Sequence, residues 1–178
     1  MPRTSKRQPL TIIEDTREQT PLTEWPSWVQ VERATLHTGD YSILGWEESF
    51  TIERKSLADL ITTMLTGYEA SSERPKRRFN RVLERMRHFD CRAVVVTATP
   101  EQVLAARFHC GKPAGAALWG FAMSIFTTYG VPVLFLGPES LAAKWIADCA
   151  RHFVAVRTKK NFSRADLSER EADRWLDF

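Results

Sequence analysis

The sequence predicts one α/β domain in which a mixed central β-sheet is flanked by helices. Its first half shows several short strands before the first helix, and its second half alternates buried strands with helices, which favours parallel neighbouring strands. The chain has 178 residues, 43% of them hydrophobic, so it is long enough for one compact core and too short for two large ones.

Local patterns define the individual elements. In the first half, periodicity predicts strands near residues 10–15, 30–36, 41–44 and 49–54, then a helix over 56–66 and an arginine-rich helix over 74–89. In the second half it predicts a strand over 92–98, helices over 101–108 and 114–129, a strand over 131–136 and a closing helix over 140–153. We expect the early strands to form mostly antiparallel sheet.

The fourth predicted strand carries the most informative chemistry. Side chains alternate between the two faces of a strand, so Phe50 and Ile52 share the buried face. Glu53 and Lys55 share the opposite face of the strand. Asp40 precedes the neighbouring strand, and a turn between the two strands would fold them into a hairpin. Two carboxylates then meet beside a lysine. Carboxylate oxygens suit Mg²⁺, and the lysine can orient an attacking water at a phosphate.

The chain passes directly from this charged strand end into a helix. Ser56 followed three residues later by Asp59 has the pattern of a capping box, and apolar residues then recur at helical spacing. A lone Glu-x-Lys triplet is more often the solvated end of a strand than a site. Here the positive N-terminal end of the helix would point back toward the carboxylates and favour a bound phosphate, which favours a site.

Two separated motifs carry a resemblance to a known family. Gly39-Asp40-Tyr41, Glu53-Arg54-Lys55-Ser56 and Asp59-Leu60 closely resemble the GD…ERKxxxD signature of the XPF family of structure-specific endonucleases, a branch of the PD-(D/E)XK nucleases. Upstream, Asp15-Thr16-Arg17-Glu18 resembles the DxRE element of the family. The resemblance implies a restriction-endonuclease-like nuclease core over residues 10–153 and a DNA phosphodiesterase activity.

The resemblance and the chemistry together predict a metal site. Asp40, Glu53 and the backbone carbonyl of Arg54 are expected to hold one Mg²⁺ or Mn²⁺, and Lys55 to position the attacking water. Asp15 is expected to complete the acidic cluster as a further catalytic and metal-binding carboxylate.

Supporting roles are predicted for neighbouring residues. Arg17 and Glu18 are expected to form a supporting pair that orients the ligands. The Arg54 side chain should lie on the opposite face from Glu53 and pair with an acid such as Glu18. Asp59 suits two roles equally well, as a helix cap or as an outer-sphere ligand of the metal.

The helix over 74–89 is the best candidate for holding DNA. Its apolar residues fall on one face, whereas its arginines fall on another at spacings of three and four. Such a column can be simple solvated surface. Beside a nuclease motif, phosphate contacts are the favoured interpretation. The arginines concerned are Arg74, Arg77, Arg78, Arg81 and Arg85.

Composition limits the setting of the protein. A net charge of +3 permits nucleic-acid binding without requiring it. Cys91, Cys110 and Cys149 are widely spaced, which predicts neither a disulfide framework nor a zinc site and favours a reducing compartment. No segment is apolar enough for a membrane span, and no phosphate loop for a nucleotide cofactor is present. We expect a cytoplasmic or nucleoid-associated protein of bacterial or phage origin.

The ends of the chain suggest a partner. Residues 1–9 are expected to be a basic, disordered start, and residues 154–178 a charged tail or short helix. That length leaves no room for the tandem helix-hairpin-helix module that the family usually carries. We therefore expect a homodimer, with residues 131–153 as one route to it, or a heteromeric partner that supplies the DNA-binding module.

Three functions remain open from the sequence. The favoured one is an endonuclease that cuts flaps, forks or other branched repair and recombination intermediates. The same site could serve a duplex-nicking or restriction-like nuclease. A non-catalytic DNA-binding scaffold is the third, and the presence of Asp40, Glu53 and Lys55 disfavours it.

Overall fold

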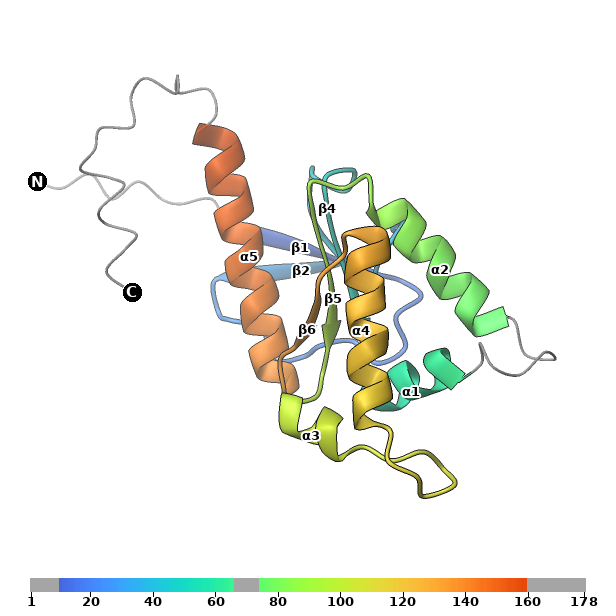
Figure 1. Ribbon diagram of the computed structural model, residues 1–178. Helices are drawn as coiled ribbons and strands as arrows, with labels where there is room; N and C mark the ends of the chain where they lie inside the picture. Colours follow the sequence, from blue (N-terminus) through green and yellow to red (C-terminus); the bar gives the residue numbers. More distant parts are fainter. Residues whose placement is uncertain (1–9, 66–73, 160–178) are drawn as a thin grey trace, which may run out of the picture.

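The structure is a computed structural model that describes residues 10–65 and 74–159, with the side chains of 74–77 and 159 left undescribed. Its strands are β1 (Leu10–Asp15), β2 (Val29–Ala34), β3 (Tyr41–Ile43), β4 (Phe50–Lys55), β5 (Cys91–Val96) and β6 (Val133–Phe135). Its helices are α1 (Leu57–Leu65), α2 (Arg74–Met86), α3 (Pro100–Ala105), α4 (Gly115–Tyr129) and α5 (Glu139–Lys159), arranged as in Figure 1.

The strands form one six-stranded mixed sheet in the order β2-β1-β3-β4-β5-β6, which confirms the predicted fold class. β3 pairs antiparallel with β1 and with β4, and β5 pairs parallel with β4 and β6. The expectation of a mostly antiparallel first half is wrong for β2, which pairs parallel with β1. Residues 16–28 return the chain to the end of the sheet where β1 begins, so β2 starts there and runs in the same direction as β1.

The predicted hairpin is confirmed. Tyr41 on β3 lies opposite Ile52 on β4 in antiparallel register. The Trp46 N–H donates to the Ile43 carbonyl over 2.9 Å and closes the turn between them. The two strands pair from the turn toward the open end of the hairpin. Asp40, the residue before Tyr41, therefore lies beside the second half of β4.

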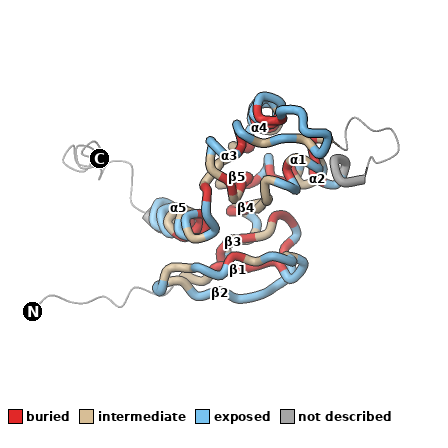
Figure 2. Tube along the Cα trace, turned by 90° about the horizontal axis from the view of Figure 1, so that it is seen from below, coloured by how far each residue is buried: buried red, intermediate tan, exposed pale blue. Residues whose placement is uncertain are grey.

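Helices cover both faces of the sheet (Figure 2). α5 packs on one face against a core that includes Ile12, Phe50 and Ile52. α1, α2 and α4 pack on the other, against a core that includes Leu83 and Leu118. β5 shows both environments, because its successive valines and alanine alternate between the two cores. β2 is an edge strand and is largely exposed.

Three helix ends differ from the predicted ones by at least three residues. α3 ends at Ala105, before the predicted end at residue 108. α2 ends at Met86, before the predicted end at residue 89. α5 runs to Lys159, past the predicted end at residue 153. An ion pair of 2.6 Å between Arg157 and Asp90 holds this extension against the start of β5. The predicted start at residues 1–9 and most of the predicted tail lie outside the described residues. Within 10–65 and 74–159, no helix has the length and apolar character needed to cross a membrane.

Candidate active site

The turn before β3 positions Asp40 next to β4. Gly39 has a φ of +79°, and a Cβ at this position would lie 2.2 Å from the Thr51 Oγ1. Only glycine therefore allows the turn to approach β4 so closely. The Asp40 N–H donates to the Ile52 carbonyl over 2.8 Å, and the Asp40 carbonyl accepts from the Asp15 N–H over 2.8 Å. These bonds fix Asp40 between β1 and β4.

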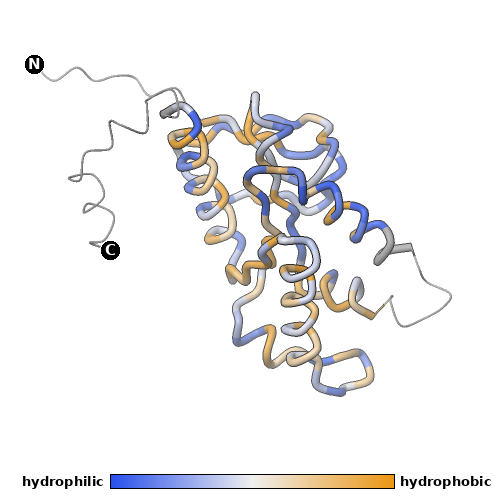
Figure 3. The backbone as a smooth tube through the Cα atoms, turned by 45° about the horizontal axis from the view of Figure 1, so that its top comes forward, coloured by the Kyte–Doolittle hydropathy of each residue, from blue (hydrophilic) through white to orange (hydrophobic). Residues whose placement is uncertain are grey.

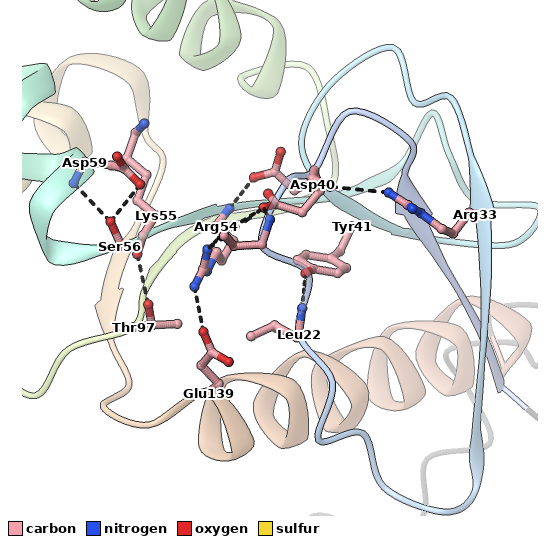
Figure 4. Close-up of polar contacts among 12 residues, drawn as sticks. Leu22, Arg33, Asp40, Tyr41, Arg54, Lys55, Ser56, Asp59, Thr97 and Glu139 are labelled. Carbon is pink, nitrogen blue, oxygen red and sulfur yellow. Dashed lines mark hydrogen bonds and ion pairs between the residues drawn. The ribbon is translucent and has the colours of Figure 1, made fainter.

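The carboxylates of Asp40 and Glu53 form a like-charged pair. Burial, and then the charge of Glu53, raise the pKa of Asp40 well above its ordinary value. Burial also raises the pKa of Glu53, although the Lys55 charge opposes it. The Arg54 N–H donates to the Asp40 Oδ2 over 2.7 Å (Figure 4). No described residue donates a hydrogen bond to the Glu53 carboxylate. Both acids thus keep unfilled oxygens in a poorly solvated position.

The backbone carbonyl of Arg54 lies on the Asp40 side of β4. The Lys55 carbonyl accepts from the Thr97 N–H over 3.0 Å and so points toward β5. Backbone groups of successive strand residues point to opposite edges. The Arg54 carbonyl therefore points the other way, like the Ile52 carbonyl that accepts from Asp40. β3 begins at Tyr41, so no β3 residue pairs with Arg54, and its carbonyl points toward the carboxylate of Asp40.

Lys55 stands beside the two acids. Its Nζ lies 4.4 Å from the centroid of the Phe79 ring on α2, close enough for a cation–π contact. Its charge lowers the pKa of both Asp40 and Glu53, against the larger effect of burial. The predicted placement of Glu53 and Lys55 on one face of the strand is in agreement with this geometry.

Asp59 caps α1. The Asp59 N–H donates to the Ser56 Oγ over 3.1 Å, and the Ser56 hydroxyl donates to the Asp59 Oδ2 over 2.7 Å (Figure 4). Of the two roles left open by the sequence, this reciprocal bonding favours the cap.

The carboxylate of Asp15 is bonded to Arg17 and to the Leu36 N–H, and not to the carboxylates of Asp40 and Glu53. Its Oδ1 accepts from the N–H and the Nε of Arg17, over 2.7 and 2.8 Å. Its Oδ2 accepts from the Arg17 Nη2 over 2.6 Å and from the Leu36 N–H over 2.9 Å. Burial alone would raise the pKa of Asp15, but these bonds outweigh it and lower the pKa. All four acceptor positions of the carboxylate are filled, so the structure does not favour Asp15 as a metal ligand.

Arg17 and Glu18 do not pair with each other, contrary to the sequence prediction. Arg17 bonds Asp15, whereas Glu18 lies 3.9 Å from the Arg54 guanidinium, which confirms the predicted partner of Arg54. Arg54 makes a closer contact of 2.8 Å with Glu139, the first residue of α5 (Figure 4). The acid at a helix start was visible in the sequence, but nothing there placed it next to β4.

The arginines of α2 lie in different environments on a helix that is hydrophilic along most of its length (Figure 3). The side chains of Arg74 and Arg77 lie outside the described residues. Arg78 is exposed, and its charge lowers the pKa of Glu53, as does that of Arg85. The Arg85 Nε donates to the Thr38 Oγ1 over 2.9 Å. Arg81 also makes an interaction of its own. α2 therefore lies close to Glu53, and one of its arginines is tied to the turn before Asp40, while the phosphate contacts of this helix stay a prediction.

A family comparison gives the context for this geometry. Residues 15–149 match the family model of the ERCC4 domain, which covers most of the chain. The chain belongs to the ERCC4 domain family. No curated protein matches the chain.

Solved structures support the same assignment of an XPF-type nuclease fold for this ERCC4 domain. XPF from Aeropyrum pernix matches with a TM-score of 0.59 and 21% identity, over 80% of this chain and 61% of that one. XPF from the same organism in complex with DNA matches with a TM-score of 0.59 and 20% identity, over 82% of this chain and 66% of that one. The chain thus spans a little under two thirds of the length of these XPF chains.

The acidic pair of this ERCC4 domain suits a hard divalent cation. In the part of the chain that the structure describes, no group of three or more His, Cys, Asp or Glu side chains is arranged to hold a metal. Mg²⁺ is commonly bound through one or two carboxylates and completes its shell with water and substrate oxygens. Asp40, Glu53 and the Arg54 carbonyl match that smaller set of oxygen ligands. A bound cation would also relieve the repulsion between the two carboxylates.

Proposed function

We propose that this domain is a divalent-metal-dependent endonuclease that hydrolyses phosphodiester bonds in DNA, with branched DNA as its preferred substrate. The observation that carries the proposal is the half-buried, mutually repelling pair Asp40 and Glu53 with Lys55 beside it. A poorly solvated like-charged pair destabilises the empty site and favours a cation.

The ligands of the proposed Mg²⁺ or Mn²⁺ are oxygens of three residues. The Asp40 Oδ1, the Glu53 carboxylate and the Arg54 carbonyl would hold the cation, while the Asp40 Oδ2 would keep its bond from the Arg54 N–H. When bound, the cation would polarise the scissile phosphate and lower the pKa of a bound water.

Lys55 orients the attacking water and offsets negative charge on the phosphate. Its ammonium group lies over the Phe79 ring, a cation–π contact that limits the positions open to it. The pair of Asp15 and Arg17 serves a different purpose. Asp15 holds the Arg17 guanidinium within electrostatic reach of both acids, where the positive charge lowers the cost of burying them.

DNA approaches along α2. Arg78 and Arg85 place positive charge near Glu53, and a phosphate group between α2 and β4 would meet this charge and Lys55 together. The likeness to an XPF structure in complex with DNA supports DNA as the ligand. These contacts position the backbone and read no sequence, which agrees with selection of DNA by shape.

The preference for branched DNA and the need for a partner rest on the family alone. The chain spans only part of the XPF chains that it matches. A second copy of this chain or a heteromeric partner is proposed to supply the remaining DNA contacts. Sedimentation with and without a forked duplex measures this directly.

Cleavage of defined substrates tests the proposal. Labelled flap, fork and linear duplex DNA are incubated with the protein in Mg²⁺, in Mn²⁺ and in chelator. Lys55→Ala is the inactive variant. Lys144→Ala is the matched control, because Lys144 is an exposed lysine on α5 that pairs only with Asp148 among the contacts described.

The expected result is metal-dependent cutting of flaps or forks by the wild type and by Lys144→Ala, and a loss of about 100-fold or more in Lys55→Ala. Equal cutting of linear duplex would favour the duplex-nicking or restriction-like function. Binding of DNA without cutting in either metal would favour the scaffold.

A further inference from the structure

Two cysteines far apart in the sequence meet where β5 and α5 touch. The Sγ atoms of Cys91, the first residue of β5, and Cys149, on α5, lie 3.7 Å apart and are separated by 58 positions in the chain. Both are free thiols, and both are partly exposed. A disulfide bond is about 2.05 Å long, so side-chain movements of less than about 2 Å in total would bring these sulfurs to bonding distance.

The contacts around the thiols hold the two elements together. The Asp90–Arg157 ion pair of 2.6 Å joins the residue before Cys91 to the end of α5. Phe153, one helical turn after Cys149, packs with its ring centroid 5.5 Å from that of Phe50 on β4. The thiols therefore meet at a fixed joint of the fold and not on a loose surface segment.

The local charges activate one sulfur. The hydrogen bond that Cys91 shares with Cys149, together with the nearby Arg92 and Arg157, lowers the pKa of Cys91 despite its burial. The same hydrogen bond and burial raise the pKa of Cys149. Because Arg92 and Arg157 lie near Cys91, its thiolate form is favoured over that of Cys149, and Cys149 is the thiol that can resolve the oxidised form of Cys91.

We propose that Cys91 and Cys149 are an oxidation site at which hydrogen peroxide converts the two thiols into a reversible disulfide between β5 and α5. The Cys91 thiolate attacks one peroxide oxygen, the O–O bond breaks, and the hydroxide that leaves takes up the proton that Cys91 released. The resulting Cys91 sulfenic acid is attacked by the Cys149 sulfur. The S–O bond breaks, and the hydroxyl group leaves with the Cys149 proton as water. Two thiols are oxidised, one peroxide is reduced, and two waters form.

The bond would fasten α5 to the sheet. α5 begins at Glu139, whose side chain holds Arg54 behind the carboxylates, so α5 is part of the support of the site. Closing a loop of this length restricts the unfolded chain, and the expected rise in Tm is on the order of 5–10 °C. The oxidation chemistry does not depend on nuclease activity, so it can be tested whether or not the domain cuts DNA.

Mass spectrometry of the full chain tests the proposal. The reduced protein is treated with stoichiometric hydrogen peroxide and digested without reductant. Cys110→Ser is the matched control, because it removes the exposed third cysteine and leaves the pair intact. Cys149→Ser removes the resolving thiol, and circular dichroism confirms that it folds.

We expect a peptide that links Cys91 to Cys149 in the wild type and in Cys110→Ser, lost on addition of a dithiol, with the intact mass lower by two hydrogen atoms. Cys149→Ser should instead accumulate a sulfenic acid at Cys91 that a sulfenic-acid-specific reagent traps. The proposal is overturned if peroxide oxidises Cys110 while Cys91 and Cys149 stay as thiols, or if every disulfide found involves Cys110.

Discussion

Asp15 and Asp40 are joined by one backbone hydrogen bond of 2.8 Å, yet their carboxylates are in opposite electrostatic states. Asp15 accepts four hydrogen bonds, three of them from Arg17, and its pKa is lowered. Asp40 accepts one bond from a backbone N–H and faces the charge of Glu53, and its pKa is raised. The two residues lie in the same part of the sheet, so location alone does not decide the role of an acid.

The two carboxylates differ in the groups that compensate their negative charge. A carboxylate with filled acceptor positions stabilises the fold and has nothing left to offer a ligand. A carboxylate buried next to another destabilises the fold, and a cation that binds there recovers that free energy. The Asp15–Arg17 pair therefore belongs to the scaffold of the site, and the Asp40–Glu53 pair to its chemistry.

The largest effect is expected from Asp40→Asn. The amide keeps the shape and can still accept from the Arg54 N–H, but it removes a charged metal ligand. Cleavage should fall by at least about 1,000-fold, whereas DNA binding should be preserved or tighter because one negative charge near the phosphates is lost. Single-turnover cleavage and a binding titration measure the two. Glu101→Gln, which neutralises an exposed acid on α3, is the control and should leave both unchanged. Parallel losses of binding and cleavage would contradict this role.

Asp15→Asn should act mainly on stability. The amide group would place N–H donors against the Arg17 guanidinium or the Leu36 N–H. Because Arg17 is more than half exposed, solvent screens part of the loss. We expect a loss of about 2 kcal/mol, which corresponds to a fall in Tm of roughly 4–8 °C for a domain of this size. Thermal unfolding measures it. If Tm were unchanged while cleavage fell as far as in Asp40→Asn, Asp15 would be a metal ligand after all.

The pH dependence of stability in chelator should separate the two acids further. Asp40, with its pKa raised, destabilises the folded protein at high pH, and this cost disappears as pH falls through the raised pKa. Asp15, with its pKa lowered, stabilises the fold above the ordinary Asp pKa, and this contribution is lost as pH falls through the lowered value.

Asp40→Asn should therefore raise Tm in chelator at pH 8 by roughly 2–5 °C, and the gain should vanish toward about pH 4. Asp15→Asn should lower Tm over the same range, with a deficit that shrinks only below about pH 4. Unfolding scans of both variants and the wild type at matched ionic strength provide the measurement. A Tm for Asp40→Asn below that of the wild type at every pH would show that the acidic pair is not a destabilising element.

The sequence predicted the elements of this fold well where local patterns define them. The charged strand end followed by Ser56 and Asp59 marked the transition from β4 to α1, and the apolar runs marked β5 and α4. The parallel pairing of β2 was missed, because the path of residues 16–28 depends on contacts such as the hydrogen bond from the Leu22 N–H to the Tyr41 hydroxyl. No local pattern predicts such a contact.

The candidate site was predicted less completely. Motif and strand alternation together placed Asp40, Glu53 and Lys55, because their positions follow from the hairpin register. The pairing of Asp15 with Arg17 did not follow, since adjacent residues after a strand end turn in different directions. Glu139 was missed because its contact with Arg54 joins residues 85 positions apart.

The smallest effects are expected from substitutions of two arginines of α2. They distinguish an arginine that contacts DNA from one that supports the structure of the site. Arg78 is exposed, whereas Arg85 bonds Thr38, whose carbonyl accepts from the Thr51 hydroxyl over 2.9 Å. Arg78→Met should weaken DNA binding about fivefold and reduce the dependence of log K on log salt by about one, with the rate at saturating DNA unchanged.

Arg85→Met should instead lower the cleavage rate and leave DNA binding nearly unchanged. The turn that carries Asp40 loses a contact, so the rate at saturating DNA should fall about threefold while the salt dependence changes little. Binding titrations at several salt concentrations, combined with cleavage rates at saturating DNA, separate the two effects. If both variants changed only the affinity, α2 would be the uniform column of phosphate contacts that its sequence predicts. If they divide as expected, Arg85 shares the role of the Asp15–Arg17 pair, because its guanidinium is committed to holding the turn on which the acidic pair depends.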